Sequence, residues 1–199
     1  MGSSDRQYNK SAIVPVSPPS VGTLTRVRRT HLALPGFGYL RRGAAPAVPA
    51  RLVRLAPDAV AEWRRLYADI GGPYHWHDRD VWTDAQLAAH LSSPEVRAFR
   101  VQALLPGAPL DTAGFLELES HSDGSVEVVY LGLARAAQGQ GLGRWLVAEA
   151  VDEARRMDAA NVWLHTCTLD GPAALPNYLA RGFTVMRTEE YETRIDASE

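Results

Sequence analysis

The stretch LGLARAAQGQGLGRWLVAEAVDEARRM, Leu131–Met157, decides the fold of this chain. It joins an apolar segment to a glycine-rich turn, and that turn to a segment whose apolar residues recur every three or four positions. This spacing predicts an amphipathic helix from Leu142 onward. Glycines at 139, 141 and 143 permit positive φ and a close approach of a ligand to backbone N–H groups. Because a helix N-terminus with free N–H groups attracts phosphate, the stretch predicts an anion-binding site.

Two common phosphate-binding loops do not fit this turn. A P-loop requires a lysine after its last glycine, and the sequence has Arg144 there. A dinucleotide-binding loop follows GxGxxG, whereas residues 139–143 read GQGLG. Arg135 and Arg144 flank the turn and favour phosphate binding. The alternative is a glycine-rich connection between a strand and a helix that binds no ligand.

The turn does have the pattern Q/R-x-x-G-x-G/A, with Gln138, Gly141 and Gly143 at the fixed places. Here the chain resembles the GNAT N-acetyltransferase superfamily. Residues 178–183 are similar to the family's closing Y-x-x-x-G-F motif. Tyr178 stands at its first place, and Gly182 and Phe183 at its last two. Two motifs in this order are more specific than either alone. Through a W-x-x-R segment at Trp76–Arg79 and the sequence HTCTLD at His165–Asp170, the chain is also similar to a bacterial subgroup of this family whose substrates are mostly unassigned.

The resemblance implies an α/β fold, a mixed central β-sheet of about six to seven strands flanked by helices on both faces. The pattern of residues 49–199 agrees with one such domain: a strand, two helices, three strands, the helix from Leu142, a strand, a short helix, and one or two final strands. Residues 1–48, rich in proline and arginine, are expected to form a partly ordered extension that wraps the domain. Within it, residues 23–34 favour a strand and residues 36–43 its return.

Local signals predict how two of the helices begin and where some turns lie. Thr83 is the expected N-cap of a helix at 83–91, and Asp170 that of the short helix that ends at Gly182. Residues 106–111, PGAPLD, read as a turn between strands.

Glu127 is the first candidate for catalysis. Six steps of about 3.3 Å separate it from Leu133, so it lies about 20 Å back along the strand from the turn, comparable with the length of a pantetheine arm. If the pyrophosphate binds at the turn and the arm follows the strand, Glu127 could accept the proton of an attacking amine. The alternatives are a solvent-facing Glu127, proton transfer through water, or Glu117 or Glu119 as the base.

The resemblance implies that the Tyr178 hydroxyl protonates the departing CoA thiolate, and the alternative is a tyrosine that only packs in the core. It also implies that backbone groups at Leu131 and Leu133 hold the amides of the pantetheine arm. Gly171 departs from the family, because many relatives have an asparagine there that contacts this arm. The expected residues of the acetyl-CoA site are Leu131, Leu133, Gln138, Gly139, Gln140, Gly141, Leu142, Gly143 and Arg144.

The acceptor site is expected in GGPYHWHDRDVW, Gly71–Trp82, between the first two helices. Tyr74 and Trp76, with Trp82, could form an aromatic wall, and Arg79 could bind a carboxylate. The alternative is that these aromatic residues anchor two helices.

The histidines of residues 71–82, His165 and Cys167 are not expected to bind a metal or to act in catalysis. His75, His77 and Asp78 lie close together but have no distant Cys or His partner of recognisable spacing, so no metal site is expected. His165 is interpreted as a core histidine, and Cys167 as a buried, inert thiol.

Net charge and hydropathy argue against a nucleic-acid-binding protein and against a membrane-spanning one. A net charge of −2 gives no broad basic field for nucleic acid, and no apolar run reaches the roughly 18 residues that span a bilayer. The N-terminal residues lack an apolar signal region, so a cytoplasmic location is expected.

The predicted function is direct transfer of an acetyl group from acetyl-CoA to a primary amine of a small molecule, amino acid or peptide. The alternative is a non-catalytic acyl-CoA-binding or sensing module, and a homodimer is left open.

Overall fold

The computed structural model describes residues 22–105 and 112–195. Within these ranges it has seven strands and four α-helices. In chain order they are β1 (Thr23–Leu34), β2 (Ala50–Arg54), α1 (Val60–Leu66), α2 (Asp84–Leu91), β3 (Val96–Ala103), β4 (Gly114–Ser120), β5 (Ser125–Leu133), α3 (Leu142–Arg156), β6 (Asn161–Cys167), α4 (Ala174–Ala180) and β7 (Thr184–Ile195). The turn expected at 106–111 lies outside the described residues. No helix of the described part is long and apolar enough to cross a bilayer.

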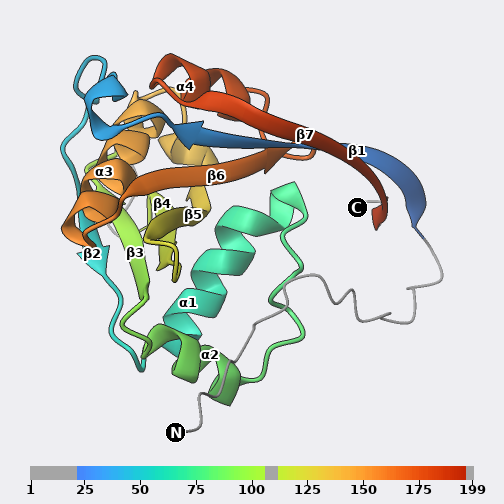
Figure 1. The fold of residues 1–199 in the computed structure, drawn as a ribbon. Helices are drawn as coiled ribbons and strands as arrows, with labels where there is room; N and C mark the ends of the chain where they lie inside the picture. Colours follow the sequence, from blue (N-terminus) through green and yellow to red (C-terminus); the bar gives the residue numbers. More distant parts are fainter. Residues whose placement is uncertain (1–21, 106–111, 196–199) are drawn as a thin grey trace, which may run out of the picture.

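The strands form one mixed sheet in the order β2-β3-β4-β5-β6-β1-β7. β5 and β6 run parallel, and the other neighbours described are antiparallel. Buried side chains of α3 and α4 pack with one face of the sheet, and those of α1 and α2 pack with the other. The layered arrangement is visible in Figure 1. The predicted α/β architecture is therefore confirmed.

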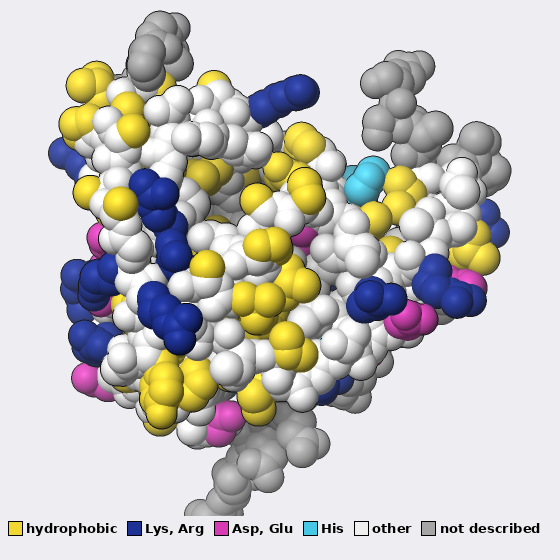
Figure 2. All heavy atoms as spheres, turned by 90° about the horizontal axis from the view of Figure 1, so that it is seen from above, with side chains coloured by type: hydrophobic (Ala, Val, Ile, Leu, Met, Phe, Trp, Pro, Cys, Tyr) yellow, Lys and Arg dark blue, Asp and Glu magenta, His cyan; other side chains and the backbone are white. Residues whose placement is uncertain are grey.

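The face on the side of α4 and β7 carries both apolar and basic side chains. Figure 2 shows hydrophobic side chains in the middle of this face and arginines toward its margins. Leu179 of α4 and Val185 and Met186 of β7 are exposed hydrophobic residues.

β1 is an internal strand of the sheet. Residues 29–34 pair with β6 on one side, and nearly all of β1 pairs with β7 on the other. Beyond β6, β1 and β7 continue as a two-stranded ribbon (Figure 1). The boundary expected at residue 48 thus falls within one sheet. The return strand expected at 36–43 is wrong: both edges of β1 are already paired, and Phe37–Tyr39 form a 3-10 turn.

β5 and β6 diverge along their length. Their pairing covers residues 125–128 and 161–164, although β5 continues to Leu133 and β6 to Cys167. On its other edge β5 contains an irregularity: Leu118 of β4 is opposite Val128, and Glu117 is opposite Tyr130. The extra residue is typical of a β-bulge, which bends the strand and increases its twist. The C-terminal halves of β5 and β6 therefore open into a wedge.

The helix starts partly agree with the sequence. Thr83 caps α2 through a capping box with Gln86, as predicted. The prediction for Asp170 is wrong, because its Oδ2 accepts hydrogen bonds from the Thr166 hydroxyl at 2.6 Å and the Cys167 N–H at 2.8 Å. Asp170 thus closes the turn that follows β6, and α4 begins at Ala174, where no described side chain caps it.

Candidate active site

The glycine-rich turn lies at the mouth of the wedge between β5 and β6. Gly139 and Gly141 have φ of 78° and 76°, a left-handed conformation that favours glycine. Gly141 is the residue before α3, which starts at Leu142. Among the residues that the structure describes, none accepts a hydrogen bond from the backbone N–H groups of residues 139–143. The turn therefore presents consecutive unpaired donors at the positive end of a helix, as an anion site requires.

Gln138 connects this turn to β5 and to the candidate acceptor loop. Its Nε2 donates to the Leu133 carbonyl at 3.2 Å and to the Tyr74 hydroxyl at 3.0 Å. On the β6 side, a Cβ added to Gly171 would lie 3.5 Å from the ring of Tyr74. Tyr74 therefore reaches from the turn after β5 to the loop after β6, across the mouth of the wedge. Leu131, like Leu133, is half-buried along β5.

Arg144 faces the N-terminal segment. Its Nε donates to the Ala44 carbonyl at 2.7 Å and its Nη2 to the Ala45 carbonyl at 3.2 Å. A Cβ added to Gly141 would lie 2.6 Å from Arg144 Nη2, so the guanidinium is also beside the turn. The structure thus places Arg144 between the turn and residues 44–45, while Arg135 is exposed.

Tyr178 of α4 is buried, with 7 % of its surface exposed. It packs near Phe183, with the ring centroids 6.2 Å apart. Within the described ranges its hydroxyl has no hydrogen-bond partner. Burial, reinforced by the charge of Asp170, raises the pKa of Tyr178 well above its ordinary value. The phenol is therefore protonated at physiological pH and can act as a proton donor.

Glu127 lies where β5 and β6 are still paired, opposite Trp163 of β6. It is 4 % exposed, so the alternative of a solvent-facing Glu127 is wrong. The Nε2 atom of His121 lies 3.2 Å from Glu127 Oε2. His121 is partly exposed and stands in the turn before β5, so it connects the buried carboxylate with the surface. The sequence did not indicate this residue, because the pair depends on how the β4–β5 hairpin folds back.

Glu117 is also buried, and three side chains surround it. Trp63 Nε1 donates to Oε2 at 2.5 Å, and His90 Nε2 lies 3.0 Å from Oε1. Arg79 Nη2 lies 3.5 Å from the same Oε1. Arg79 is only 6 % exposed, so its guanidinium interacts with Glu117 and has little contact with solvent. These contacts give Glu117 and Arg79 a structural task, holding the loop between α1 and α2 against β4.

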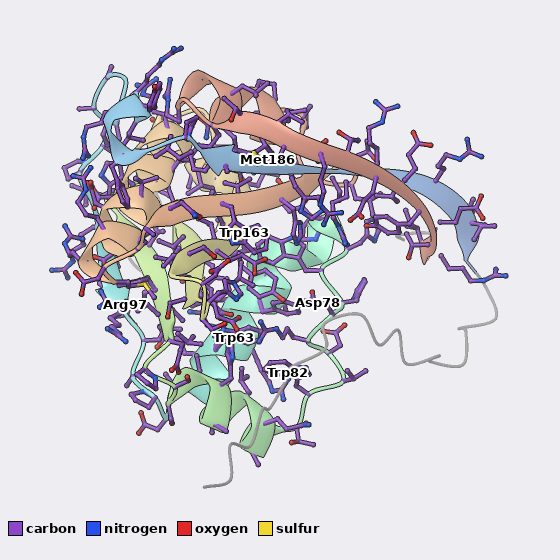
Figure 3. All side chains as sticks on the ribbon, viewed as in Figure 1. Trp63, Asp78, Trp82, Arg97, Trp163 and Met186 are labelled. Atoms are coloured by element: carbon purple, nitrogen blue, oxygen red, sulfur yellow. The ribbon has the colours of Figure 1, made fainter. Side chains whose placement is uncertain are left out.

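The aromatic residues of this loop are packed against β5. The ring of Trp76 lies 4.9 Å from that of Tyr130 and 6.0 Å from that of Tyr67, centroid to centroid. Both tyrosine hydroxyls donate to Asp78, which Figure 3 shows with Trp63 and Trp82 on the α1–α2 side of the sheet. This packing supports the alternative of an anchoring role for Trp76. Tyr74 is half-buried at the mouth of the wedge and remains a candidate for ligand contact.

The remaining sequence candidates lie on β6. His165 is exposed, so its interpretation as a core histidine is wrong. Its ring makes an edge contact with His31, at 5.7 Å between centroids. Cys167 is half-buried, and burial together with Asp170 raises the pKa of its thiol. Over residues 22–105 and 112–195, no cluster of three or more His, Cys, Asp or Glu side chains is arranged to hold a metal ion.

Comparisons with known proteins place this geometry in a family. The profile of the acetyltransferase (GNAT) family matches residues 58–183. A mycothiol acetyltransferase of Jonesia denitrificans is 29 % identical over 147 residues, which are 72 % of this chain and 46 % of that protein. The chain thus spans less than half the length of this curated relative.

Solved structures show the same fold. A GCN5-related N-acetyltransferase from Kribbella flavida superimposes with a TM-score of 0.56 at 23 % identity, over 89 % of this chain and 61 % of that one. A second one, from Sphaerobacter thermophilus, gives a TM-score of 0.58 at 16 % identity, over 90 % and 55 % of the two chains. Because the family profile covers more than half of the sequence, this chain belongs to the GNAT acetyltransferase family.

Proposed function

We propose that this chain transfers an acetyl group from acetyl-CoA to a primary amine. The observation that carries the proposal is the row of unpaired N–H groups at residues 139–143, at the mouth of the wedge between β5 and β6. In this proposal the pyrophosphate of acetyl-CoA accepts hydrogen bonds from these groups. A helix N-terminus stabilises such a dianion without any lysine.

The pantetheine arm then follows β5. Beyond Val128 the edge of β5 that faces β6 has no partner strand, so its backbone groups can bind the amides of the arm as an added strand would. Leu131 and Leu133 lie on this free part of β5. Gln138 already binds the Leu133 carbonyl, and β4 pairs with the opposite edge of β5, so the backbone groups of residues 129–132 that point away from β4 are left for the arm.

The chemistry is a direct attack. The amine nitrogen forms a bond to the thioester carbonyl carbon and the carbon–sulfur bond breaks. The proton of the nitrogen passes to Glu127, directly or through water, and His121 offers it a path to solvent. Tyr178 gives its proton to the departing thiolate and recovers one from solvent. A tyrosine phenol is protonated at neutral pH, and the buried Tyr178 has no described partner for its hydroxyl, so the proton is available when the thiolate forms.

The acceptor is placed beside the loop between α1 and α2, with Tyr74 at the mouth of the wedge and Trp76 behind it. Arg79 supports this loop through Glu117, and we assign it no direct contact with the acceptor. The name of the Jonesia denitrificans relative suggests one amine to test, the acceptor of mycothiol acetyltransferase.

The test combines calorimetry with coenzyme A and thiol release from acetyl-CoA over a panel of amines. Wild type should bind coenzyme A and release thiol with at least one amine, and Glu127→Gln should reduce kcat more than it reduces coenzyme A affinity. Tight binding without release with any amine would indicate the non-catalytic module. Absence of binding, or a nucleotide bound away from residues 139–143, would overturn the assignment.

A further inference from the structure

Part of the sheet face that carries α1 and α2 is not covered by these helices. Among the described residues, the buried cluster around α1 and α2 includes side chains of β3, β4 and β5 but none of β6, β1 or β7. Residues of these last three strands, with Asp123 and Ser125, line a hollow of about 510 Å³, within the size range of small-molecule sites. Trp163 and Met186, labelled in Figure 3, are two of them. None of the lining residues belongs to the glycine-rich turn, to α4 or to residues 71–82, so the hollow is separate from the wedge.

The hollow lies on the side of the sheet opposite to α3. Alternate residues of β1 and β6 are buried in the core that contains α3: Leu32, Leu34, Val162 and Leu164. Because side chains alternate between the two faces of a strand, Ala33 and Trp163 lie on the other face. In the sheet Ala33 is opposite Trp163 on one side and Thr184 of β7 on the other. The small methyl group of Ala33 leaves the space above it unfilled, and its larger neighbours form the walls.

Trp163 offers a fixed flat surface at this hollow. Its Nε1 donates to the Ser125 hydroxyl at 3.2 Å, which sets the orientation of the indole. The ring of His31 is stacked beside it, with 6.5 Å between the centroids and 28° between the planes. Met186, 68 % exposed, is the extra residue where the register between β1 and β7 shifts, and it lines the same hollow. An indole and a thioether together favour an aromatic ligand.

The β7 side of the hollow has an excess of positive charge. Glu189 is the only carboxylate that the described residues place in an ion pair with Arg29 or with Arg187, at 3.5 Å and 3.0 Å. The same carboxylate lies 3.0 Å from His31 Nε2. One negative charge is thus shared by two guanidinium groups and an imidazole. Arg187 lines the hollow, its side chain is 61 % exposed, and it binds Glu189 through Nη1, which leaves further N–H donors for an anion.

Asp123 is on the opposite side of the hollow and does not cancel this charge. Its Oδ1 accepts a hydrogen bond from the Ser125 N–H at 2.9 Å, in the turn before β5. Three strand spacings of about 4.8 Å, or about 14 Å in total, separate β5 from β7. That distance exceeds the screening length of about 8 Å at physiological ionic strength. An anionic group is therefore favoured beside Arg187.

We propose that the hollow binds a small aromatic carboxylate, with its ring above Ala33 and against Trp163 and its carboxylate beside Arg187. A guanidinium binds a carboxylate through two parallel, charge-assisted hydrogen bonds. Binding here requires neither acetyl-CoA nor turnover, so the inference is independent of the proposed function. Trp163 also contacts His121, the partner of Glu127, with 5.7 Å between the ring centroids. An occupant of the hollow is thus one side chain away from the outer end of the proposed proton path.

The first experiment compares three ligands that share one ring: indole-3-acetate, tryptamine and indole. The full chain, labelled with ¹⁵N, is titrated with each ligand, and binding is followed at the indole N–H signal of Trp163. The chain has five tryptophans, and Trp163→Phe identifies the signal by its loss. We expect the Kd of the carboxylate to be lower, about tenfold or more, than that of the cation or of the uncharged ring. No saturable shift with the carboxylate, or equal affinity for the cation, would overturn the proposal.

The second experiment localises the ligand with Ala33→Ile, which fills the hollow with a residue that strands favour. This variant should lose saturable binding of indole-3-acetate. Ala61→Ile, the same change at an exposed position of α1, should bind as wild type does. Thermal melting shows whether each variant is folded. A folded Ala33→Ile variant that binds as tightly as wild type would place the ligand elsewhere and overturn the assignment.

The third experiment tests the charge with Arg187→Gln, a change at an exposed side chain that leaves the packing around Ala33 as it is. It should remove the preference for indole-3-acetate over tryptamine, because the carboxylate loses its paired hydrogen bonds. Arg194→Gln, at an exposed arginine of the same strand, should keep the preference. A preference that persists in Arg187→Gln would mean that another group binds the carboxylate, and the proposed site would be wrong.

Discussion

At the scale of single residues, Tyr178 combines burial with a hydroxyl that no other described residue binds. We expect Tyr178→Phe to lower kcat for thiol release about a hundredfold, because protonation of a leaving group by a placed acid contributes that much or more. The KM for acetyl-CoA should change little. Because the pKa of Tyr178 is raised, its contribution should persist up to pH 10. Tyr39→Phe, at an exposed tyrosine, is the control, and equal rates for both variants would contradict the role.

Glu117 is the residue whose loss should cost the most stability. Replacement by Gln leaves Arg79 buried without its Glu117 charge partner and weakens the contacts with Trp63 and His90. Breaking a buried ion pair by removing one partner costs about 3–5 kcal/mol. We therefore expect the free energy of unfolding, measured with urea, to fall by at least about 3 kcal/mol.

The comparison for Glu117 is Glu192→Gln, at an exposed position of β7. Surface substitutions of this kind change stability by about 0.5 kcal/mol or less. If the two variants unfold at the same urea concentration, the buried network does not hold the loop as described.

The sequence could predict the residues of the turn because their chemistry is local. Glycine spacing and the helix that follows are both contained in residues 138–157, and the structure has them as expected. His121 and Arg181 could not be predicted in this way. Their neighbours, Glu127 and Gly43, come close only when the β4–β5 hairpin closes or when residues 41–49 fold over α3.

At the scale of elements, β5 and the segment after α1 fit closely. A Cβ on Gly132 would lie 2.4 Å from Ile70 Cγ2 and 3.2 Å from Trp76 Cη2. Gly132→Ala should push β5 away from the π-helix Tyr67–Gly71 and lower the free energy of unfolding by about 1–3 kcal/mol, as overpacking does. Urea unfolding measures this change. Gly38→Ala, where no atom lies within 4 Å of the added Cβ, should be close to neutral, and a similar loss in both would contradict the steric argument.

The spacing of apolar residues predicted where helices and strands lie, but not which strands pair with one another. The apolar residues at Trp63, Leu66 and Ile70 lie buried on one face, as their spacing predicts. α1 nevertheless ends at Leu66 and continues as a π-helix. The place of β1 between β6 and β7 was not predictable, because the pairing joins segments more than 120 residues apart and no local pattern records it.

At the scale of the whole molecule, the wedge is a consequence of topology. Two separate cores fix the two faces of the sheet, one with α3 and α4 and the other with α1 and α2. β4 holds one edge of β5 along its length, while β6 is held by β1, so the two halves of the sheet can diverge at the parallel pair without losing their other hydrogen bonds. The same divergence brings the turn after β5 and the loop after β6 to one edge, where Tyr74 spans them.

The whole molecule should also lose stability in alkali. Burial, followed by the charge of Asp78, raises the pKa of both Tyr67 and Tyr130, and burial followed by Asp170 raises that of Tyr178. A group whose pKa is higher in the folded state contributes stability that is complete below its unfolded value and is lost as pH rises above it. That unfolded value is 10.0 for tyrosine.

Burial also raises the pKa of the Cys167 thiol and of the Tyr191 phenol. We therefore expect the free energy of unfolding to begin to fall above pH 9, because the unfolded value of the thiol is 9.0. It should fall more steeply above pH 10, by up to about 4 kcal/mol per pH unit from Tyr67, Tyr130 and Tyr178 if these phenols stay protonated in the folded state. Urea unfolding between pH 8 and 11.5 measures the slope. Tyr178→Phe removes one of these protons, so its slope should be shallower by up to about 1.4 kcal/mol per pH unit, whereas Tyr39→Phe should keep the wild-type slope. A flat profile above pH 10 would mean that these hydroxyls ionise as readily inside the fold as in water.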